Sequence, residues 1–171
     1  QGDSHEMLNP KIQNALNDQV KHELYSEYVY LAVSAYCYSI NLPGFAHWFQ
    51  MQSSEERVHA MKLYNFILDR GGQVKLQALD APAYEFGTPL QIAQKALEHE
   101  TKVTAYINKL YELALHENDY PTQVLLQWFI NEQVEEEKNA NLLIDQLTMV
   151  GDNRAALLMM DFELGKRTGP A

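Results

Sequence analysis

The chain has 171 residues, 46% hydrophobic and 21% charged, so it is long enough to bury one sizeable core and too short to be expected to form two domains. Its formal net charge of −10 argues against nucleic-acid binding, which needs clustered Lys and Arg, and favours a protein that attracts cations. The single cysteine, Cys37, rules out an internal disulfide and is typical of a reducing compartment. Because the sequence shows neither the apolar run of a membrane span nor a signal-peptide core, we expect a cytoplasmic protein with no membrane partner.

The N-terminal region is expected to consist of a short polar extension followed by a helix. Residues 1–6 are polar and lack periodicity, so we interpret them as an N-terminal extension or an expression remnant, with Met7 as the native start. A first helix is predicted from Asn9 or Pro10 to about Ser39. Asn is a favourable N-cap residue and Pro is well suited to the first helical position.

A short turn and a long loop determine how the next helices are connected. The turn at residues 41–44 predicts that a second helix, running to about Arg70, lies antiparallel to the first. Gly71-Gly72 ends this helix. Residues 73–87 show no helical pattern, and Pro82 interrupts them. Since fifteen residues can cross the length of a bundle, the following helix is expected to start at the same end as the second helix did.

Three more helices are predicted beyond this crossover. They cover about residues 88–116, from the turn at 118–121 to about 150, and about 154–164. The sequence therefore predicts an all-α fold, a four-helix bundle with one long crossover loop and a short fifth C-terminal helix. We expect one domain over residues 7–165, followed by a flexible tail at 166–171.

Helical spacing predicts one inward-facing stripe on each long helix. The stripes are Ile12, Leu16, Gln19, Glu23, Ser26, Tyr30, Val33 and Cys37; Phe45, Phe49, Gln52, Glu56, His59, Leu63 and Phe66; Leu90, Ala93, Leu97, Glu100, Thr104, Ile107, Tyr111 and Ala114; and Leu126, Phe129, Gln133, Glu136, Ala140, Leu143 and Leu147. A glutamate near the midpoint interrupts each stripe. These residues are Glu23, Glu56, Glu100 and Glu136. Helix midpoints lie at one level of a bundle, so the four carboxylates are expected to converge, and they cannot stay ionised there without cations. His59, three residues after Glu56, adds an imidazole; such a pair alone is weak evidence, because residues three apart often share a helix face by chance. Oxygen-rich ligation with a single imidazole favours two iron or manganese ions over structural zinc.

The segments that carry these residues resemble the corresponding segments of ferritins. They are Glu23-Leu24-Tyr25 with Tyr30, Glu56-x-x-His59, the isolated Glu100, and Asn131-Glu132-Gln133-x-x-Glu136. The resemblance covers residues 7–165 and is greatest to bacterial non-haem ferritins. The second Glu-x-x-His of many ferritin-like di-iron proteins is absent, since Asn139 takes the place of its histidine. Arg57 stands where bacterioferritins carry a haem-ligating methionine, so the resemblance implies that no haem is bound.

The resemblance also implies roles for the inward-facing residues. Glu23, Glu56 and His59 would hold one iron, and Glu56, Glu100 and Glu136 the other, with Glu56 bridging. Tyr30 is similar to the tyrosine beside the ferritin di-iron centre, although it also suits a core aromatic residue with a satisfied hydroxyl. Gln133 resembles a residue that positions the oxidant, and it also suits a simple hydrogen-bonding partner of a ligand. The histidines outside these stripes are expected to be solvated.

A second acidic group follows from the spacing on the fourth helix. Glu132, Glu135 and Glu136 crowd one side of this helix, and like charges at such spacing destabilise it. One interpretation is a solvated acidic face. The other, implied by the resemblance to bacterial non-haem ferritins, is a third iron site formed by Glu55, Glu132, Glu135 and Glu136.

The function implied by the resemblance is iron storage coupled to ferroxidase activity. Fe(II) would be oxidised by oxygen or hydrogen peroxide at the paired site, and ferric mineral would be stored inside a shell of 24 identical subunits. Two alternatives remain at this point: a di-iron oxidase or peroxidase without storage, and a helical bundle whose glutamates bind structural calcium. Particle mass separates the first alternative from storage, and an iron-dependent absorbance change in air separates both from the calcium-binding bundle.

Overall fold

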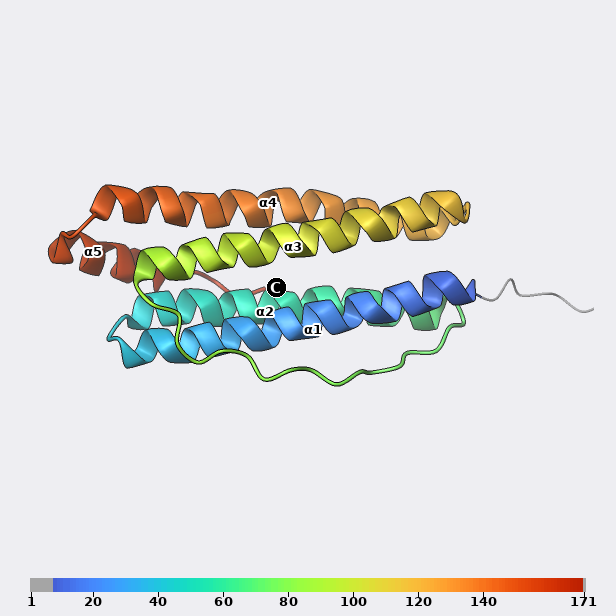
Figure 1. The fold of residues 1–171 in the computed structure, drawn as a ribbon, viewed down its shortest axis with the longest axis horizontal. Coiled ribbons are helices and arrows are strands. Elements are labelled where there is room, and N and C mark those ends of the chain that lie inside the picture. The colour runs from blue at the N-terminus through green and yellow to red at the C-terminus, as the bar shows by residue number, and fades with distance from the viewer. Residues whose placement is uncertain (1–7, 171) are drawn as a thin grey trace, which may run out of the picture.

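The computed structural model describes residues 8–170, which form four long helices packed as a bundle and a short helix across one end (Figure 1). The helices are α1 (Pro10–Ser39), α2 (Pro43–Asp69), α3 (Pro89–His116), α4 (Tyr120–Val150) and α5 (Arg154–Leu164). The predicted all-α fold, its crossover and its fifth helix are confirmed. The expectations for an extension at residues 1–6 and a start at Met7 lie outside the described residues. Among the described helices, none is both long and apolar enough to span a bilayer.

The helix starts are determined by local side-chain chemistry. The Asn9 side chain accepts a hydrogen bond from the Lys11 amide at 2.8 Å, and Pro10 occupies the first helical position, as predicted. Thr88 and Gln91 exchange side-chain and backbone hydrogen bonds as a capping box at the start of α3. Asp119 caps α4. Each long helix except α2 therefore begins with a hydrogen-bonded cap, which fixes where its midpoint lies.

The crossover, residues 73–87, runs along the bundle beside α1 (Figure 1). At its beginning, the buried Asn17 side chain donates to the Gln73 carbonyl at 2.9 Å and accepts from the Lys75 amide at 2.8 Å. At its end, the Tyr36 hydroxyl donates to the Gly87 carbonyl at 2.6 Å. These bonds hold both ends of the loop to α1 and let α3 start at the same end of the bundle as α2.

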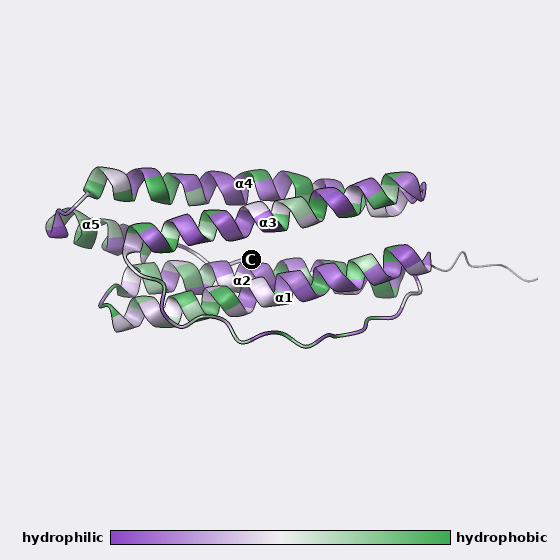
Figure 2. Cartoon of the chain, viewed as in Figure 1, coloured by the Kyte–Doolittle hydropathy of each residue, from purple (hydrophilic) through white to green (hydrophobic). Residues whose placement is uncertain are grey.

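The apolar core is divided into two clusters, one toward each end of the bundle. The cluster nearer α5 is formed around Val33, Cys37, Phe45, Phe49, Ile92, Leu143 and Leu147. The other is formed around Ile12, Leu16, Leu63, Ile67, Ile107, Leu126 and Phe129. Figure 2 shows hydrophilic and hydrophobic residues interleaved along the helices. Between the two clusters the buried side chains are polar, and this middle layer is called the midsection below.

The buried face of α3 is wider than the predicted stripe. Ala93, Glu100, Ile107 and Ala114 are buried as expected. Leu90, Leu97, Thr104 and Tyr111, also predicted to face inward, are only half-buried. The remaining buried positions are Ile92, Ala96, Val103 and Leu110. Because α3 packs against both α1 and α4, its buried surface extends around the helix beyond one narrow stripe.

Helix α5 docks on the start of α2, and the segment after it folds back. The Asp161 carboxylate accepts a hydrogen bond from the Phe45 amide at 2.8 Å, and a Cβ on Gly44 would lie 1.6 Å from the Asp161 carbonyl oxygen. Glycine at position 44 therefore permits this close approach. Within the segment expected to be a flexible tail, Arg167 contacts α2, donating to the Trp48 carbonyl at 3.1 Å.

Candidate metal centre

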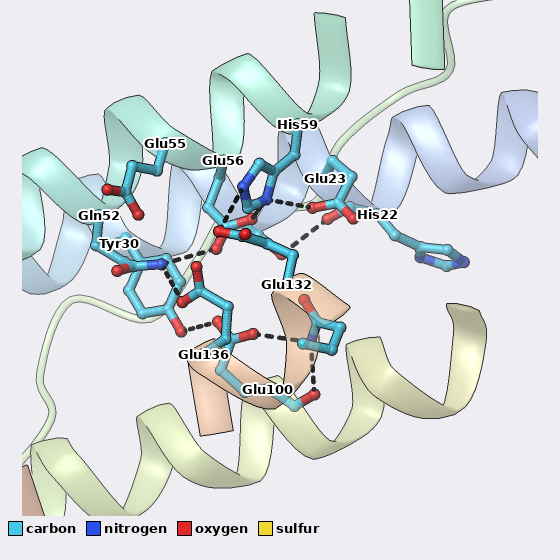
Figure 3. A network of polar contacts seen from close by, with 12 residues as sticks. His22, Glu23, Tyr30, Gln52, Glu55, Glu56, His59, Glu100, Glu132 and Glu136 are labelled. Carbon is cyan, nitrogen blue, oxygen red and sulfur yellow. Dashed lines mark hydrogen bonds and ion pairs between the residues drawn. The ribbon is translucent and has the colours of Figure 1, made fainter. Parts of the chain in front are cut away.

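Four buried carboxylates meet in the midsection, one from each long helix (Figure 3). Glu23 on α1, Glu56 on α2, Glu100 on α3 and Glu136 on α4 are exposed by 0%, 2%, 2% and 5%. Each lies close to the middle of its helix, and the four helices have similar lengths. The structure therefore brings together the four glutamates that were expected from the sequence to lie at one level of the bundle.

Ligand-type atoms in the midsection form three groups whose members lie within 4.8 Å of one another. The groups are Glu23 with Glu56 and His59, Glu56 with Glu100 and Glu136, and His59 with Glu132 and Glu136. Glu56 belongs to the first two groups. Its carboxylate thus lies between two neighbouring positions that a cation could occupy, which is the arrangement of a bridging ligand.

Without bound cations, the midsection disfavours ionised carboxylates. Burial raises the pKa of Glu23 well above its usual value, and the nearby Glu56 raises it further. Burial, followed by the charge of Glu100, likewise raises the pKa of Glu56. The same two causes raise the pKa of Glu136 to about 8. The metal-free centre therefore retains protons near neutral pH, and divalent cations would displace them.

Two unsatisfied atoms show that the first group fits a cation. Among the buried side chains that the structure describes, Glu23 Oε2 and His59 Nδ1 lack a hydrogen-bond partner. They lie 3.9 Å apart, and His59 Nδ1 is 3.2 Å from Glu56 Oε2 without hydrogen-bonding geometry. A buried polar atom without a partner costs about 1–3 kcal/mol. A cation among these three side chains would give both atoms a partner.

Amide donors surround the carboxylates and leave oxygens free. Gln19 donates to Glu23 Oε1 at 3.1 Å, while Glu23 Oε2 has no partner. Gln52 donates to Glu56 Oε1 at 3.0 Å and to Glu136 Oε2 at 2.7 Å. The spacing analysis did not assign either glutamine to the site. A signal was present, because each glutamine lies on the inward stripe four residues before a ligand glutamate.

Tyr30 and Gln133 both bind Glu100. The buried Tyr30 hydroxyl donates to Glu100 Oε1 at 2.5 Å, and Gln133 donates to Glu100 Oε2 at 3.2 Å. Gln133 also reaches the Thr104 hydroxyl at 3.2 Å. Burial, then the charge of Glu100, raises the pKa of Tyr30 well above its usual value, so the phenol stays protonated and acts as a donor.

The residues expected at a third iron site are not all together. Glu132 Oε1 lies 3.6 Å from His59 Nε2, and the interaction with this imidazole lowers the pKa of Glu132. Glu55 is instead paired with Arg167 at 3.0 Å. Glu135 is exposed and belongs to none of the ligand groups formed by the described residues.

The expectation that the histidines outside the stripes are solvated is wrong for His99. Its Nε2 lies 2.7 Å from the hydroxyl of the buried Ser26. Burial lowers the pKa of His99 to about 4, so the imidazole is neutral at physiological pH. His22 is half-buried and stacks on Tyr106 with ring centroids 3.9 Å apart. The sequence pattern failed here because polar contacts at the edge of a buried face carry no periodic signal.

Comparison with known sequences identifies the family of this fold and centre. The ferritin family model, described as "Ferritin-like domain", matches residues 13–150. The chain belongs to the ferritin family. The match runs from the first turn of α1 to the end of α4, and it contains each glutamate of the midsection.

Individual ferritins match over nearly the whole chain. The bacterial non-heme ferritin of Staphylococcus aureus (strain USA300) is 41% identical over 162 residues, covering 95% of this chain and 98% of that protein. That of Bacteroides fragilis (strain 638R) is 38% identical over 161 residues, covering 94% and 100%. Among solved structures, the open pore ferritin of Archaeoglobus fulgidus superposes with a TM-score of 0.93 at 42% identity, covering 94% and 99%. The resemblance to bacterial non-haem ferritins is thereby confirmed.

Proposed function

We propose that the midsection is a ferroxidase centre that binds two Fe(II) ions as substrates. One ion would be held by Glu23, Glu56 and His59, and the other by Glu56, Glu100 and Glu136. The observation that carries this proposal is that two groups of buried ligand atoms share the Glu56 carboxylate. Membership of the ferritin family, whose general functions are iron oxidation and storage, supports the choice of iron over other divalent metals.

The chain supplies proton storage and ligand orientation for this reaction. In the metal-free centre, burial disfavours ionised carboxylates, so the carboxyl groups hold protons. These protons leave as Fe(II) binds, because the cation compensates the charge of the ionised carboxylates. Two Fe(II) ions give two electrons to one oxygen molecule, which takes two protons and leaves as hydrogen peroxide. Hydrogen peroxide as the oxidant would take the same two electrons and two protons and be reduced to two water molecules.

Tyr30 and Gln133 have supporting roles in this proposal. Both donate to Glu100, so they orient the carboxylate that holds the second ion. Gln133 would then act first as a positioning partner of a ligand, with any contact to the oxidant as an additional role. The short distance from the Tyr30 hydroxyl to Glu100 supports a tyrosine beside the paired site, rather than a core aromatic residue unconnected to it.

A third cation site is proposed next to the pair. The group of His59, Glu132 and Glu136 supports it, and Glu132 is half-buried, so this position is wetter than the paired site and its affinity should be lower. Glu55 would join only after leaving Arg167. Glu135, which helical spacing assigns to the same group, is exposed, and the geometry gives no support for including it.

Storage would require assembly of many copies into a shell, and we propose the 24-subunit homo-oligomer of the family. On α5, the side chains of Leu158, Met159 and Phe162 are exposed by 60%, 72% and 69%. Exposed apolar side chains on one short helix are suited to burial against other subunits. This supports α5 as an assembly element, as the family resemblance implies for the fourfold axes.

The second candidate function is a di-iron oxidase without storage. It is favoured by one observation: all ligand groups come from a single chain, so oxidation does not itself need a shell. The test is aerobic loading with Fe(II) at increasing ratios, followed by gel filtration with protein and iron measured across the elution. We expect many more than three iron atoms per chain to elute with a large particle. Oxidation with at most three retained iron atoms per chain would establish the non-storage alternative, and absence of oxidation would overturn both.

A further inference from the structure

Arg167, three residues beyond α5, connects the C-terminal segment to the metal centre. The segment runs back from α5 toward the middle of the bundle (Figure 1). The Arg167 guanidinium donates to Gln52 Oε1 at 2.9 Å, pairs with Glu55 at 3.0 Å and lies 4.2 Å from the centre of the Trp48 ring. His47 Nε2 donates to the Arg167 carbonyl at 2.7 Å. Contacts from both backbone and side chain thus fix this arginine, whose side chain is only 15% exposed.

The contact with Gln52 determines which way its amide faces. A guanidinium has only donors, so the Gln52 oxygen must point toward Arg167 and the amide nitrogen must point the other way. That nitrogen donates to Glu56 Oε1 and to Glu136 Oε2. A reversed amide would place its oxygen against two carboxylates. One arginine therefore fixes a donor shared by the bridging glutamate and by a ligand of the second ion.

The pairing with Glu55 has a separate consequence. Glu55 lies on α2 beside Glu56, and its charge contributes to raising the pKa of Glu136. Glu55 is paired with Arg167 and belongs to none of the ligand groups formed by the described residues. The same side chain thus contacts both a donor to the centre and an acidic residue beside it.

We propose that Arg167 is a positioning residue of the paired metal site, acting through the Gln52 amide on Glu56 and Glu136. The inference rests on the proposed function, because it assigns a role toward the same two ions. It also links the site to α5, since the contact of Asp161 with the start of α2 sets where the chain turns back and hence where Arg167 lies. Residues far beyond the four-helix bundle in sequence thereby become part of the centre.

The test is anaerobic titration of the full-length protein with Co(II), followed by calorimetry and by the visible absorption of bound Co(II). For Arg167→Gln, we expect the overall affinity for two Co(II) ions to fall about 10- to 100-fold, the range found when partners of metal ligands are removed. We also expect the absorption spectrum to change, because the carboxylates lose their fixed orientation. Arg167→Lys, which retains the charge, should recover part of the affinity.

The matched control is Lys166→Gln, which removes the same charge one residue earlier. Lys166 contacts only Glu163 and the Phe162 ring among the interactions that the structure records, so its variant should bind Co(II) like the wild type. A double variant provides the second control. If Arg167 acts through Gln52, then Arg167→Gln should have little further effect on affinity in a Gln52→Leu background.

The outcomes distinguish failure of this inference from failure of the proposed function. If the wild-type protein fails to bind two Co(II) ions, the proposed function is overturned, together with this inference. If the wild type binds two ions while Arg167→Gln matches Lys166→Gln in affinity and spectrum, this inference alone is overturned. If the effects of Arg167→Gln and Gln52→Leu on Co(II) affinity were fully additive, this would contradict the proposal that Arg167 acts through the Gln52 amide.

Discussion

The ends of the bundle and its midsection are built from the same four helices but are stabilised in opposite ways. At the ends, Leu63 and Ile67 on α2 are fully buried among other apolar side chains, and this burial favours folding by itself. In the midsection, Glu56 on the same helix is equally buried beside three other carboxyl groups. Its burial costs free energy until protons or cations compensate the charges. The comparison shows that the ends maintain the fold, while the midsection brings together groups that could hold cations.

The largest expected effect concerns the stability of an apolar end. Leu63→Ala removes a fully buried side chain and leaves a cavity, so it should reduce the free energy of unfolding by about 2–5 kcal/mol. The control is Leu68→Ala on the same helix, where the side chain is 49% exposed and the change should stay within about 0.5 kcal/mol. Denaturant unfolding of the metal-free protein measures both. Equal losses of unfolding free energy in the two variants would contradict the conclusion that the buried apolar ends maintain the fold.

The next effect concerns the shared ligand of the midsection. Glu56→Ala removes a carboxylate from both ion positions, so the initial rate of Fe(II) oxidation should fall by more than about 100-fold. His59→Ala should weaken mainly one position. Glu98→Ala, at an exposed site on α3, removes the same charge and should leave the rate unchanged. Rapid mixing with Fe(II) and oxygen measures all three, and a wild-type rate in Glu56→Ala would show that Glu56 does not bridge.

A third effect appears in the pH dependence of the metal-free protein. The pKa of Glu136 is raised from 4.5 to about 8, so the folded state holds a proton that the unfolded chain loses at lower pH. Its contribution to stability is complete below pH 4.5 and is lost as the pH rises through about 8. Glu136, which titrates together with its carboxylate neighbours, should therefore contribute to a fall in the free energy of unfolding between pH 5 and pH 7.

Glu136→Gln provides the control for this pH effect, because the amide has no proton to lose. The variant should show a weaker loss of stability over the same pH interval, measured by denaturant unfolding in the presence of a chelator. Bound divalent cations should reverse the trend, since they bind the deprotonated carboxylates. An unchanged pH dependence in Glu136→Gln would contradict the assignment.

The smallest expected effect is a difference between Glu132 and Glu135, two acidic residues on α4 at the border of the midsection. Glu132→Ala should change the amount of iron oxidised per oxygen molecule and leave binding of two ions intact, because Glu132 belongs to the third ligand group and to neither group of the proposed pair. Glu135→Ala, at an exposed position one turn away, should have neither effect. Oxygen consumption during Fe(II) titration measures the ratio. The same ratio in both variants would remove the support for a third site at Glu132.

The parts that the sequence predicted well were those with a periodic signal. The buried stripe of α4 was predicted residue by residue, including Gln133 and Glu136, because one narrow face of that helix is buried. The positions of Gln19 and Gln52 were also predicted, but their bonds to the ligands depend on side-chain rotamers that spacing does not determine. Arg167 could not be predicted, since its contact with α2 depends on how α5 docks.

The connectivity of the bundle has a consequence for the order in which the centre forms. Helices α1 and α2 make one hairpin, and α3 and α4 make another, and the crossover is the stretch of chain that connects the two. The proposed ligands of the first ion, Glu23, Glu56 and His59, all belong to the first hairpin, so this group can be complete before the hairpins associate. The second position needs Glu56 from one hairpin and Glu100 with Glu136 from the other. If the centre acts as proposed, a nascent chain would be able to bind a single metal ion early during synthesis. Two-electron chemistry would have to wait until the second half of the chain had been made and had docked.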